Sequence, residues 1–291
     1  MSARIAHYRK RLPVRIAALF LGSLLIFMTA ALSARAAPPA ELWARWTAHD
    51  KGSVMTIDHA AWGAFLGKYV RTGARGVNLV RYGTVTTEDR RNLDGYIAHL
   101  SLAPISTYSR RVQLAYWINL YNALTIQTVL RHFPVDSIRD IDISPGWFAS
   151  GPWGRKQVEV EGVALSLDDI EHRILRPIWR DPRIHYAVNC ASVGCPNLQR
   201  APYTGENVER MLTFAAREYI NNWRGVTFED GDLYISEIYK WYATDFGDSH
   251  WAIIAHLRKY AMPKLREMLG RVEGIEGYRY DWSINAEPFS G

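Results

Sequence analysis

The sequence predicts a single α+β domain, in which a small, mainly antiparallel sheet packs against several helices. Three observations indicate this class: helical periodicity outweighs strand patterns, the clearest strand signals come as hairpins, and no repeat or long linker divides residues 37–291. With 291 residues and 48% apolar content, the chain can bury a sizeable core. This excludes disordered, collagen-like and disulfide-rich miniprotein classes.

The first 36 residues are predicted to be a signal peptide. Basic residues up to Arg15 precede an uncharged stretch of 17 residues, and Ala34 and Ala36 suit a cleavage site. Cleavage near Ala36 would make the protein periplasmic or secreted. The alternative is an inner-membrane protein held by an uncleaved segment, because 17 residues approach the length that spans a bilayer.

The formal net charge of +6 lies entirely in this N-terminal segment. Residues 1–36 hold six basic and no acidic residues, which leaves 29 of the 35 Lys and Arg against 29 Asp and Glu in residues 37–291. We therefore expect no nucleic acid partner, and membrane contact only through the N-terminal segment.

Helices are predicted from apolar periodicity and from capping signals. Glu88 and Asp89 suit the first turn of a helix, and Ser166 with Asp169 fits a capping box. Pro134 ends the longest periodic segment. The predicted helices cover residues 57–70, 86–100, 109–131, 166–175 and 206–221, and residues 237–269 are expected to be rich in helix.

Strands are predicted from alternation and from turn residues. Residues 226–228 and 233–235 flank an Asp-Gly turn and should form a hairpin. Other expected strands are residues 156–163, 183–189 and 278–284. Residues 144–156 contain several Gly and Pro around two tryptophans and are predicted to form a surface loop.

Two asparagines stand out in the helix predicted over residues 109–131. Asn119 and Asn122 are three residues apart and share one face of an otherwise apolar helix. A buried amide without partners costs about 1–3 kcal/mol, so each needs hydrogen bonds. They either tie loops to the core or face a ligand.

Glu171 and His172 are adjacent in the helix predicted over residues 166–175. Adjacent helical side chains point about 100° apart, so both cannot face a substrate from the same direction. His172 is a candidate general base, because histidine titrates near neutral pH. It could equally be a histidine that takes no direct part in chemistry.

The segment from His185 to Pro196 carries the densest chemistry in the chain. If the strand persists to Cys190, alternation places His185 and Asn189 on one face and Cys190 on the other. His185 and Cys190 would then not form a simple nucleophile–base pair, and His172 is the next candidate in sequence.

Three interpretations of this segment remain open. Cys190 could be a thiolate nucleophile activated by a histidine, which Glu171 or Asn119 would orient. Cys190 and Cys195 could form a disulfide, which suits an exported protein. His185 and the two cysteines could hold a metal, but the sequence offers no fourth ligand at a recognisable spacing.

Trp241 and Asp245 are spaced as neighbours on one helix face, where they could brace the domain or line a cleft. The chain lacks the Gly-rich nucleotide-binding motifs, H-E-x-x-H and G-x-S-x-G. We therefore expect no cofactor and no metal.

Four runs of residues, in this order, resemble the domain-of-unknown-function 547 family. They are residues 116–124 (YWINLYNAL), 167–176 (LDDIEHRILR), 185–196 (HYAVNCASVGCP) and 241–246 (WYATDF). The resemblance spans about residues 105–250. It implies a bacterial exported domain but no reaction. Its motifs contain Asn119, Asn122, Glu171, His172, His185, Cys190, Cys195 and Asp245.

These observations lead to the hypothesis of a thiol-dependent hydrolase or acyl-transferase that acts on a small molecule or peptide. The expected catalytic residues are Cys190, His172, Glu171, His185 and Asn119. The expected binding residues are Asn122, Ser192, Trp241 and Asp245.

Two other functions stay open. One is a non-catalytic binding or scaffolding module with a Cys190–Cys195 disulfide and a contact surface at the Trp-rich loop, residues 147–153. The other is thiol redox activity, although the cysteine spacing differs from C-x-x-C.

Overall fold

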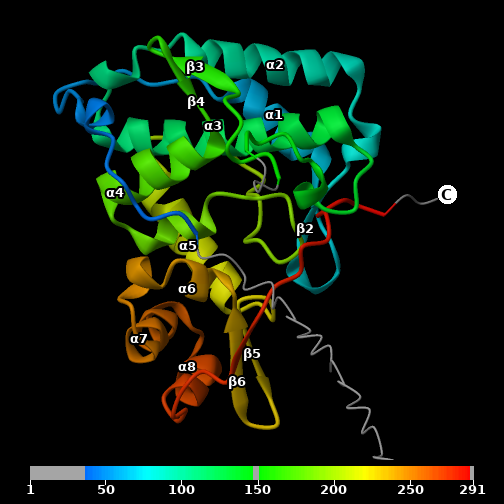
Figure 1. Cartoon of the computed structure of the whole chain (residues 1–291), viewed down its shortest axis with the longest axis vertical. Coiled ribbons are helices and arrows are strands. Elements are labelled where there is room, and N and C mark those ends of the chain that lie inside the picture. Colours follow the sequence, from blue (N-terminus) through cyan, green and yellow to red (C-terminus); the bar gives the residue numbers. More distant parts are fainter. Residues whose placement is uncertain (1–36, 147–150, 289–291) are drawn as a thin grey trace, which may run out of the picture. The chain divides into compact units, whose positions relative to one another are not determined.

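A computed structural model describes residues 37–146 and 151–288 (Figure 1). The predicted signal peptide and Trp147 lie outside the described residues. The helices are α1 (Ala60–Tyr69), α2 (Thr87–Ser101), α3 (Arg110–His132), α4 (Arg176–Trp179), α5 (Val208–Ile220), α6 (Ile238–Trp241), α7 (His250–Tyr260) and α8 (Pro263–Leu269). The strands are β1 (Val70–Thr72), β2 (Asn78–Val80), β3 (Val158–Val160), β4 (Val163–Leu165), β5 (Val226–Glu229), β6 (Asp232–Ser236) and β7 (Gly277–Arg279).

The predicted α+β class is confirmed. Within the described residues the strands form three small sheets rather than one, with β1 beside β2, β3 beside β4, and β6 between β5 and β7. The pairs β1–β2, β3–β4 and β5–β6 are antiparallel, whereas β6 and β7 are parallel. The strands are too short to build one large sheet, so the helices provide most of the packing surface.

Helix α3 is the centre of the larger hydrophobic cluster. Its side chains are buried from Val112 to Leu130 because the helix is apolar almost all round, and α2 and the segment before α4 pack on it. A second cluster joins β5, β6, α7 and the C-terminal half of α5. Helix α5 contributes Val208 and Leu212 to the first cluster and Tyr219 and Ile220 to the second, and so links the two.

The β5–β6 hairpin is confirmed. Asp230 and Gly231 have positive φ values of 51° and 97° in its turn, as the Asp-Gly sequence predicts. The closing strand is shorter than predicted, because β7 ends at Arg279. Beyond it the chain is irregular, with single bridges from Ser283 and Ile284 to other segments.

The strand predicted over residues 183–189 is wrong. Residues Pro182–Tyr186 form a 3₁₀-helix, and the Asp181 side chain accepts a hydrogen bond from Arg183 N at its start. Asp followed by Pro is a helix-start signal, and here it outweighs the alternation of the following residues. The prediction that His185 and Cys190 lie on opposite faces of a strand is therefore also wrong.

The capping box is confirmed, but the helix that follows differs from the prediction. Ser166 and Asp169 exchange hydrogen bonds between side chain and backbone. Residues Asp169–Leu175 then form a π-helix that continues into α4, so helical structure runs to Trp179 rather than ending at Leu175. Pro177 lies inside this continuous helix, where its missing N–H leaves a carbonyl group of the preceding turn without its helical donor.

The loop predicted over residues 144–156 is less superficial than expected. Gly151 and Pro152 are buried, and Trp153 packs edge-on against Trp282 with ring centroids 6.0 Å apart.

In the described part of the chain, no helix combines the length and apolarity needed to span a membrane.

Candidate functional site

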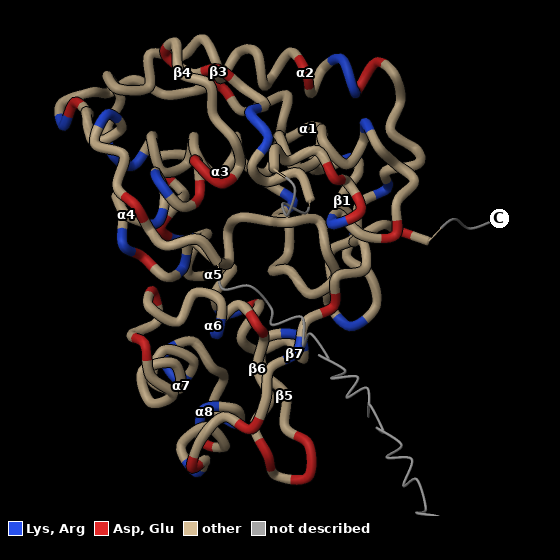
Figure 2. The backbone as a smooth tube through the Cα atoms, in the orientation of Figure 1, with Lys and Arg blue, Asp and Glu red and all other residues tan. Residues whose placement is uncertain are grey.

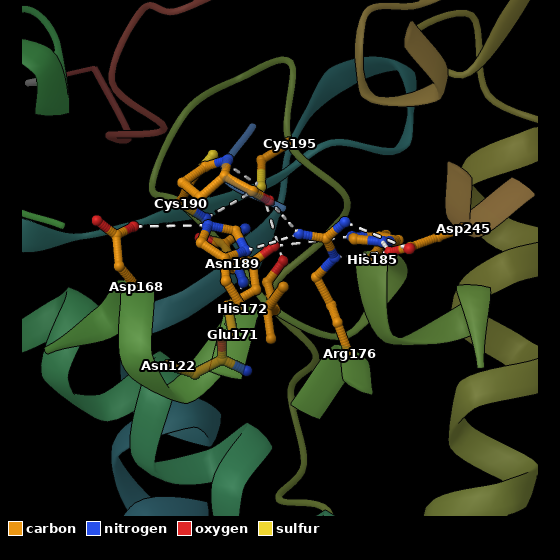
Figure 3. Close-up of polar contacts among 12 residues, drawn as sticks. Asn122, Asp168, Glu171, His172, Arg176, His185, Asn189, Cys190, Cys195 and Asp245 are labelled. Carbon is orange, nitrogen blue, oxygen red and sulfur yellow. Dashed lines mark hydrogen bonds and ion pairs between the residues drawn. The ribbon is translucent and has the colours of Figure 1, made fainter. Parts of the chain in front are cut away.

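A cluster of charged and imidazole side chains forms where the π-helix meets the segment around Asp245. We call it the histidine–carboxylate cluster (Figure 3). Four of its members come from the helical stretch that contains the π-helix, and the others come from the 3₁₀-helices at 182–186 and 243–246. Its members are Asp168, Glu171, His172, Arg176, His185 and Asp245.

Asp245 binds two partners at once. Its Oδ2 accepts hydrogen bonds from Arg176 Nε at 2.6 Å and from His185 Nε2 at 2.7 Å, and its Oδ1 lies 3.3 Å from Arg176 Nη2. Burial favours the protonated acid, but His185 and Arg176 outweigh burial and hold the pKa of Asp245 well below its usual range. Asp245 is therefore ionised and fixes both partners.

Glu171 is buried on the other side of His185. Its Oε1 lies 3.7 Å from His185 Nδ1, which makes no hydrogen bond among the described residues. Burial opposes ionisation of Glu171, but His172, His185 and Arg176 outweigh burial and lower its pKa to about 2. The His185 ring also stacks on Tyr242, with centroids 3.9 Å apart. His185 is thus held between two carboxylates and an aromatic ring.

His172 faces a different part of the cluster. Arg176 Nη1 lies 3.1 Å from its Nδ1, and Asp168 Oδ1 lies 3.5 Å from its Nε2. Glu171 and His172 therefore point apart, as expected for adjacent helical residues, yet both belong to one network. π-Helical turns are rare and occur often at functional sites.

The described N-terminus of the chain lies against the same helix. Arg176 Nη1 donates to Pro38 O at 2.6 Å, Glu41 N to His172 O at 2.9 Å, and Trp43 N to Arg173 O at 3.0 Å. We call residues 38–43 the N-terminal strap. It supplies donors to carbonyl groups that the π-helix leaves available.

Cys190 and Cys195 are free thiols, and their sulfur atoms lie 3.1 Å apart. Cys190 is half-buried and Cys195 is buried. Cys190 Sγ also lies 3.0 Å from the Tyr280 hydroxyl and 3.3 Å from Ser192 Oγ, and these two oxygens are 2.8 Å apart. The half-buried sulfur therefore has three neighbours that can donate a hydrogen bond to it.

The two thiols have opposite pKa shifts. The hydrogen bond between Cys190 and Cys195 lowers the pKa of Cys190, with further lowering by Ser192 and Tyr280, and together they outweigh burial. Burial raises the pKa of Cys195, and the neighbouring Cys190 raises it further. Cys190 is therefore the sulfur that more readily becomes a thiolate, the nucleophilic form.

The loop from Cys190 to Asn197, which we call the cysteine loop, is held from two directions. The C-terminal segment binds it through Val193 N to Ser283 O and Gly194 N to Asp281 O, both at 2.8 Å. From the other side, Arg224 donates to the carbonyl groups of Val193 and Cys195 at 3.0 and 2.8 Å. The Tyr219 hydroxyl adds a 2.7 Å bond to Gly194 O.

Residues 105–220, which contain the π-helix and the cysteine loop, match the family model described as "Protein of unknown function, DUF547". The match supports assignment of this part of the chain to the DUF547 family. Asp245 and Tyr280 lie beyond the matched region. No curated protein and no solved structure matched the chain.

In the DUF547 region, Cys190 and the histidines are not directly paired. Among the described contacts, neither His172 nor His185 makes a hydrogen bond to Cys190, whose side-chain partners are Cys195, Ser192 and Tyr280. The charge of Glu171 nevertheless reaches Cys190 and opposes its ionisation. The cluster and the thiol are thus electrostatic neighbours without a direct dyad.

Asn119 does not join the histidine–carboxylate cluster through any described contact. Its amide bonds to the backbone of Tyr203, with Nδ2 2.7 Å from Tyr203 O and Oδ1 3.1 Å from Tyr203 N. Asn122 similarly bonds Ala187 O at 2.9 Å and Asn189 N at 2.8 Å. Of the two alternatives for these amides, the structure shows the one in which they tie loops to the core.

Trp241 and Asp245 are not braced against each other. Helix α6 ends at Trp241 and a 3₁₀-helix follows, so the two side chains lack the helical spacing that was assumed. The Trp241 ring packs instead on Tyr280 and Trp282, at centroid distances of 4.8 and 5.4 Å. Ser192, the other expected binding residue, is buried, with its Oγ 3.3 Å from Cys190 Sγ.

Sequence reasoning missed four residues that shape these sites: Arg176, Tyr242, Tyr280 and Arg224. Arg176 could have been found, because it follows His172 by four residues in a helix. Tyr280 could not, because it approaches Cys190 from 90 residues away in sequence.

The structure contains neither the disulfide nor the metal site that the sequence left open for Cys190 and Cys195 within the described residues. The sulfur atoms are close but not bonded. In residues 37–146 and 151–288, no group of three or more His, Cys, Asp or Glu side chains is arranged to hold a metal ion. The set of His185, Cys190 and Cys195 considered from the sequence is therefore not assembled.

Proposed function

We propose that this protein is a thiol-dependent hydrolase or acyl-transferase in which Cys190 is the nucleophile. One observation carries the proposal: the sulfur of the half-buried residue Cys190 lies within hydrogen-bonding distance of Cys195, Ser192 and Tyr280. Hydrogen bonds to a thiolate stabilise it, and the thiolate is the attacking form of cysteine. Activation of this kind can replace a histidine in contact with the sulfur.

In the proposed reaction, Cys190 attacks the carbonyl carbon of an ester, thioester or amide. A carbon–sulfur bond forms, the bond to the leaving group breaks, and the leaving group takes up a proton. Burial raises the pKa of Tyr280 well above its usual value, so this phenol stays protonated as a donor. Water or a second nucleophile then releases the acyl group from Cys190.

The histidine–carboxylate cluster is assigned a positioning role in this proposal. His172 and His185 are bound to Asp168, Arg176 and Asp245 rather than to the sulfur. They would act as general base only through a substrate or a water molecule. Asn119 is left out of the proposed catalytic set because its amide is used by Tyr203.

The test is trapping of an acyl-enzyme on the full chain with a set of activated esters and thioesters. We expect stoichiometric acylation of Cys190 in a peptide map and turnover of at least one substrate. Cys190→Ser should abolish both. Cys195→Ser is the comparison variant, because it keeps the nucleophile and places a hydroxyl where the neighbouring thiol was. Equal acylation of wild type and Cys190→Ser would contradict the proposal.

A second candidate is a non-catalytic binding or scaffolding module. It is favoured by the mutual pairing of buried cluster residues such as Glu171, Arg176 and His185, which is typical of a structural polar core. In this case Cys190 would be modified by the esters without turnover. The acylation experiment therefore distinguishes the two functions.

We also propose that the protein is exported and cleaved near Ala36, with a small molecule or peptide as its partner. The basic and apolar pattern of residues 1–36 supports this proposal. N-terminal sequencing of the protein from its source cells tests it. A mature chain that begins at Ala37 is expected, whereas one that retains residues 1–36 would favour the inner-membrane anchor.

A further inference from the structure

The two thiols of the cysteine loop already lie at a distance from which sulfur can react with sulfur. Their Sγ atoms are 3.1 Å apart, and Cys195 Sγ also accepts a hydrogen bond from Cys190 N at 3.0 Å. Cys190 is half-buried, whereas Cys195 is only 4% exposed. Cys190 is therefore the more accessible of the two residues to an external disulfide.

The cysteine loop keeps the sulfurs together because its backbone is fixed. Ala191 has a positive φ of 58°. Its N–H donates a 2.9 Å hydrogen bond to Oδ1 of Asn189, two residues earlier, which fixes the turn. A Cβ at Gly194 would come within 2.7 Å of Asp281 N, so the loop packs directly on the C-terminal backbone. A fixed loop of this kind lowers the entropy cost of bringing two thiols together.

A buried cation binds the backbone of the second cysteine. Arg224 is 7% exposed and donates to Val193 O, Cys195 O and Asn197 Oδ1. No ion pair of Arg224 is found within the described residues, and burial lowers the pKa of Arg224 although the charge of Glu218 opposes this. An unpaired guanidinium is costly to bury, and a thiolate forming at Cys195 would offset part of that cost.

We propose that Cys190 and Cys195 are a reversible dithiol–disulfide pair that exchanges electrons with a small-molecule or protein disulfide. Cys190 is the attacking thiol and Cys195 the resolving thiol. This activity shares the reactive Cys190 with the proposed function but uses Cys195 differently. Here Cys195 is a second nucleophile, whereas in acyl transfer it is only a hydrogen-bond partner of Cys190.

Two exchange steps balance the reaction. The Cys190 thiolate attacks one sulfur of the external disulfide, whose S–S bond breaks and releases one thiolate. Cys195 then gives its proton to solvent and attacks the Cys190 sulfur, which displaces the second external thiolate. The protein loses two electrons and two thiol protons, and the external disulfide becomes two thiols. The oxidised protein has no free nucleophile, so exchange and acyl transfer cannot occur together.

The experiment follows the reduced full chain by intact mass spectrometry after addition of oxidised glutathione. Wild type should form the internal disulfide and keep no glutathione, because the second step is intramolecular. Cys195→Ser should stop at a stable mixed disulfide on Cys190. Cys190→Ser should react at least about tenfold more slowly, because the remaining thiol is buried. A wild type that keeps glutathione as Cys195→Ser does would overturn the inference.

Arg224 gives a second, independent readout. Arg224→Met should slow the release of glutathione from the mixed disulfide by about tenfold, and Arg224→Lys should restore part of the rate, because a nearby cation favours the attacking thiolate. Equal release rates in wild type and Arg224→Met would remove the proposed role of this residue. Circular dichroism checks that both variants are folded.

The outcomes for the two proposals are separable. Internal disulfide formation without acylation of Cys190 by any ester would leave the dithiol pair standing and reject the acyl-transferase. If the wild type instead turns over an acyl substrate and keeps a stable mixed disulfide with glutathione, the acyl-transferase proposal stands and the dithiol pair is rejected.

Discussion

Cys190 differs from an ordinary buried cysteine in the number of donors around its sulfur. Tyr280 and Ser192 approach it with hydroxyl groups, and Cys195 approaches it with a thiol. Each hydrogen bond to a charged group contributes about 1.5–3 kcal/mol. Their combined effect outweighs both burial and the negative charge of Glu171.

Replacing Tyr280 by Phe should make the Cys190 thiol less acidic. The substitution removes one donor to the thiolate, so we expect the pKa of Cys190 to rise by about one unit. The ultraviolet absorbance of the thiolate, followed against pH, measures this change. Tyr278→Phe is the matched control, because this neighbouring tyrosine has no contact with the sulfur. Identical titrations for Tyr280→Phe and wild type would show that the hydroxyl is not a donor.

Glu171 should make the stability of the fold depend on pH in the acid range. Its pKa is lowered in the folded protein from 4.5 to about 2, so the folded state binds the proton less readily than the unfolded state. The resulting stability, on the order of 3 kcal/mol, is present above pH 4.5 and is lost as the pH falls toward 2. Urea unfolding at several pH values should show a shallower loss for Glu171→Gln. Parallel curves would contradict this role for Glu171.

Capping, periodicity and turn signals predict those helices and turns whose geometry depends on residues close together in the sequence. The Ser166–Asp169 capping box, the apolar α3 and the Asp-Gly turn of the β5–β6 hairpin all depend on residues near one another in sequence. The alternation of residues 183–189 predicts a strand, whereas the Asp-Pro start signal at residues 181–182 leads to the 3₁₀-helix at 182–186. The π-helix could not be predicted, because its hydrogen-bond register depends on packing against α3 and the N-terminal strap.

Asn122→Ala tests the link between α3 and the cysteine loop. The substitution leaves Ala187 O and Asn189 N without their partner, which should lower the free energy of unfolding by about 2–4 kcal/mol. Chemical denaturation measures this loss. Asn92→Ala, on the exposed face of α2, should change stability by less than about 0.5 kcal/mol. Equal effects of the two substitutions would show that the Asn122 amide does not stabilise the link between α3 and the cysteine loop.

The N-terminal strap is tested by removing one backbone donor. Glu41→Pro deletes the N–H that bonds His172 O and should cost about 1 kcal/mol, with faster hydrogen exchange over residues 37–46. Glu41→Ala keeps that N–H and is the matched control. Unchanged exchange in Glu41→Pro would mean that the strap does not depend on this bond.

For the whole molecule, the sequence predicts the fold class and the balance of acidic and basic residues. It does not predict which distant residues come together at the two sites. Figure 2 shows acidic and basic residues interspersed along the described chain, in line with the balance of 29 against 29 after residue 36. The histidine–carboxylate cluster joins Arg176 to Asp245, 69 residues apart. Separations of this size are set by the packing of the whole chain, which periodicity and capping signals do not report.

The two hydrophobic clusters should unfold together, because α5 contributes to both. Leu212→Ala in the first cluster and Ile220→Ala in the second should each cost about 2–5 kcal/mol. Both should accelerate hydrogen exchange in α3 and in α7, and each should shift a single denaturation transition. Exchange that rises only in α7 for Ile220→Ala would instead indicate two independently folding parts.

The identity of the reactive thiol is the central claim, and competitive alkylation tests it most directly. The native, reduced full chain is treated with a trace of labelled iodoacetamide near neutral pH, and the label on each cysteine is compared with that of the urea-unfolded chain. We predict that native Cys190 reacts faster than unfolded Cys190 and at least about tenfold faster than native Cys195. A native Cys190 that reacts more slowly than the unfolded residue, or no faster than Cys195, would contradict the account.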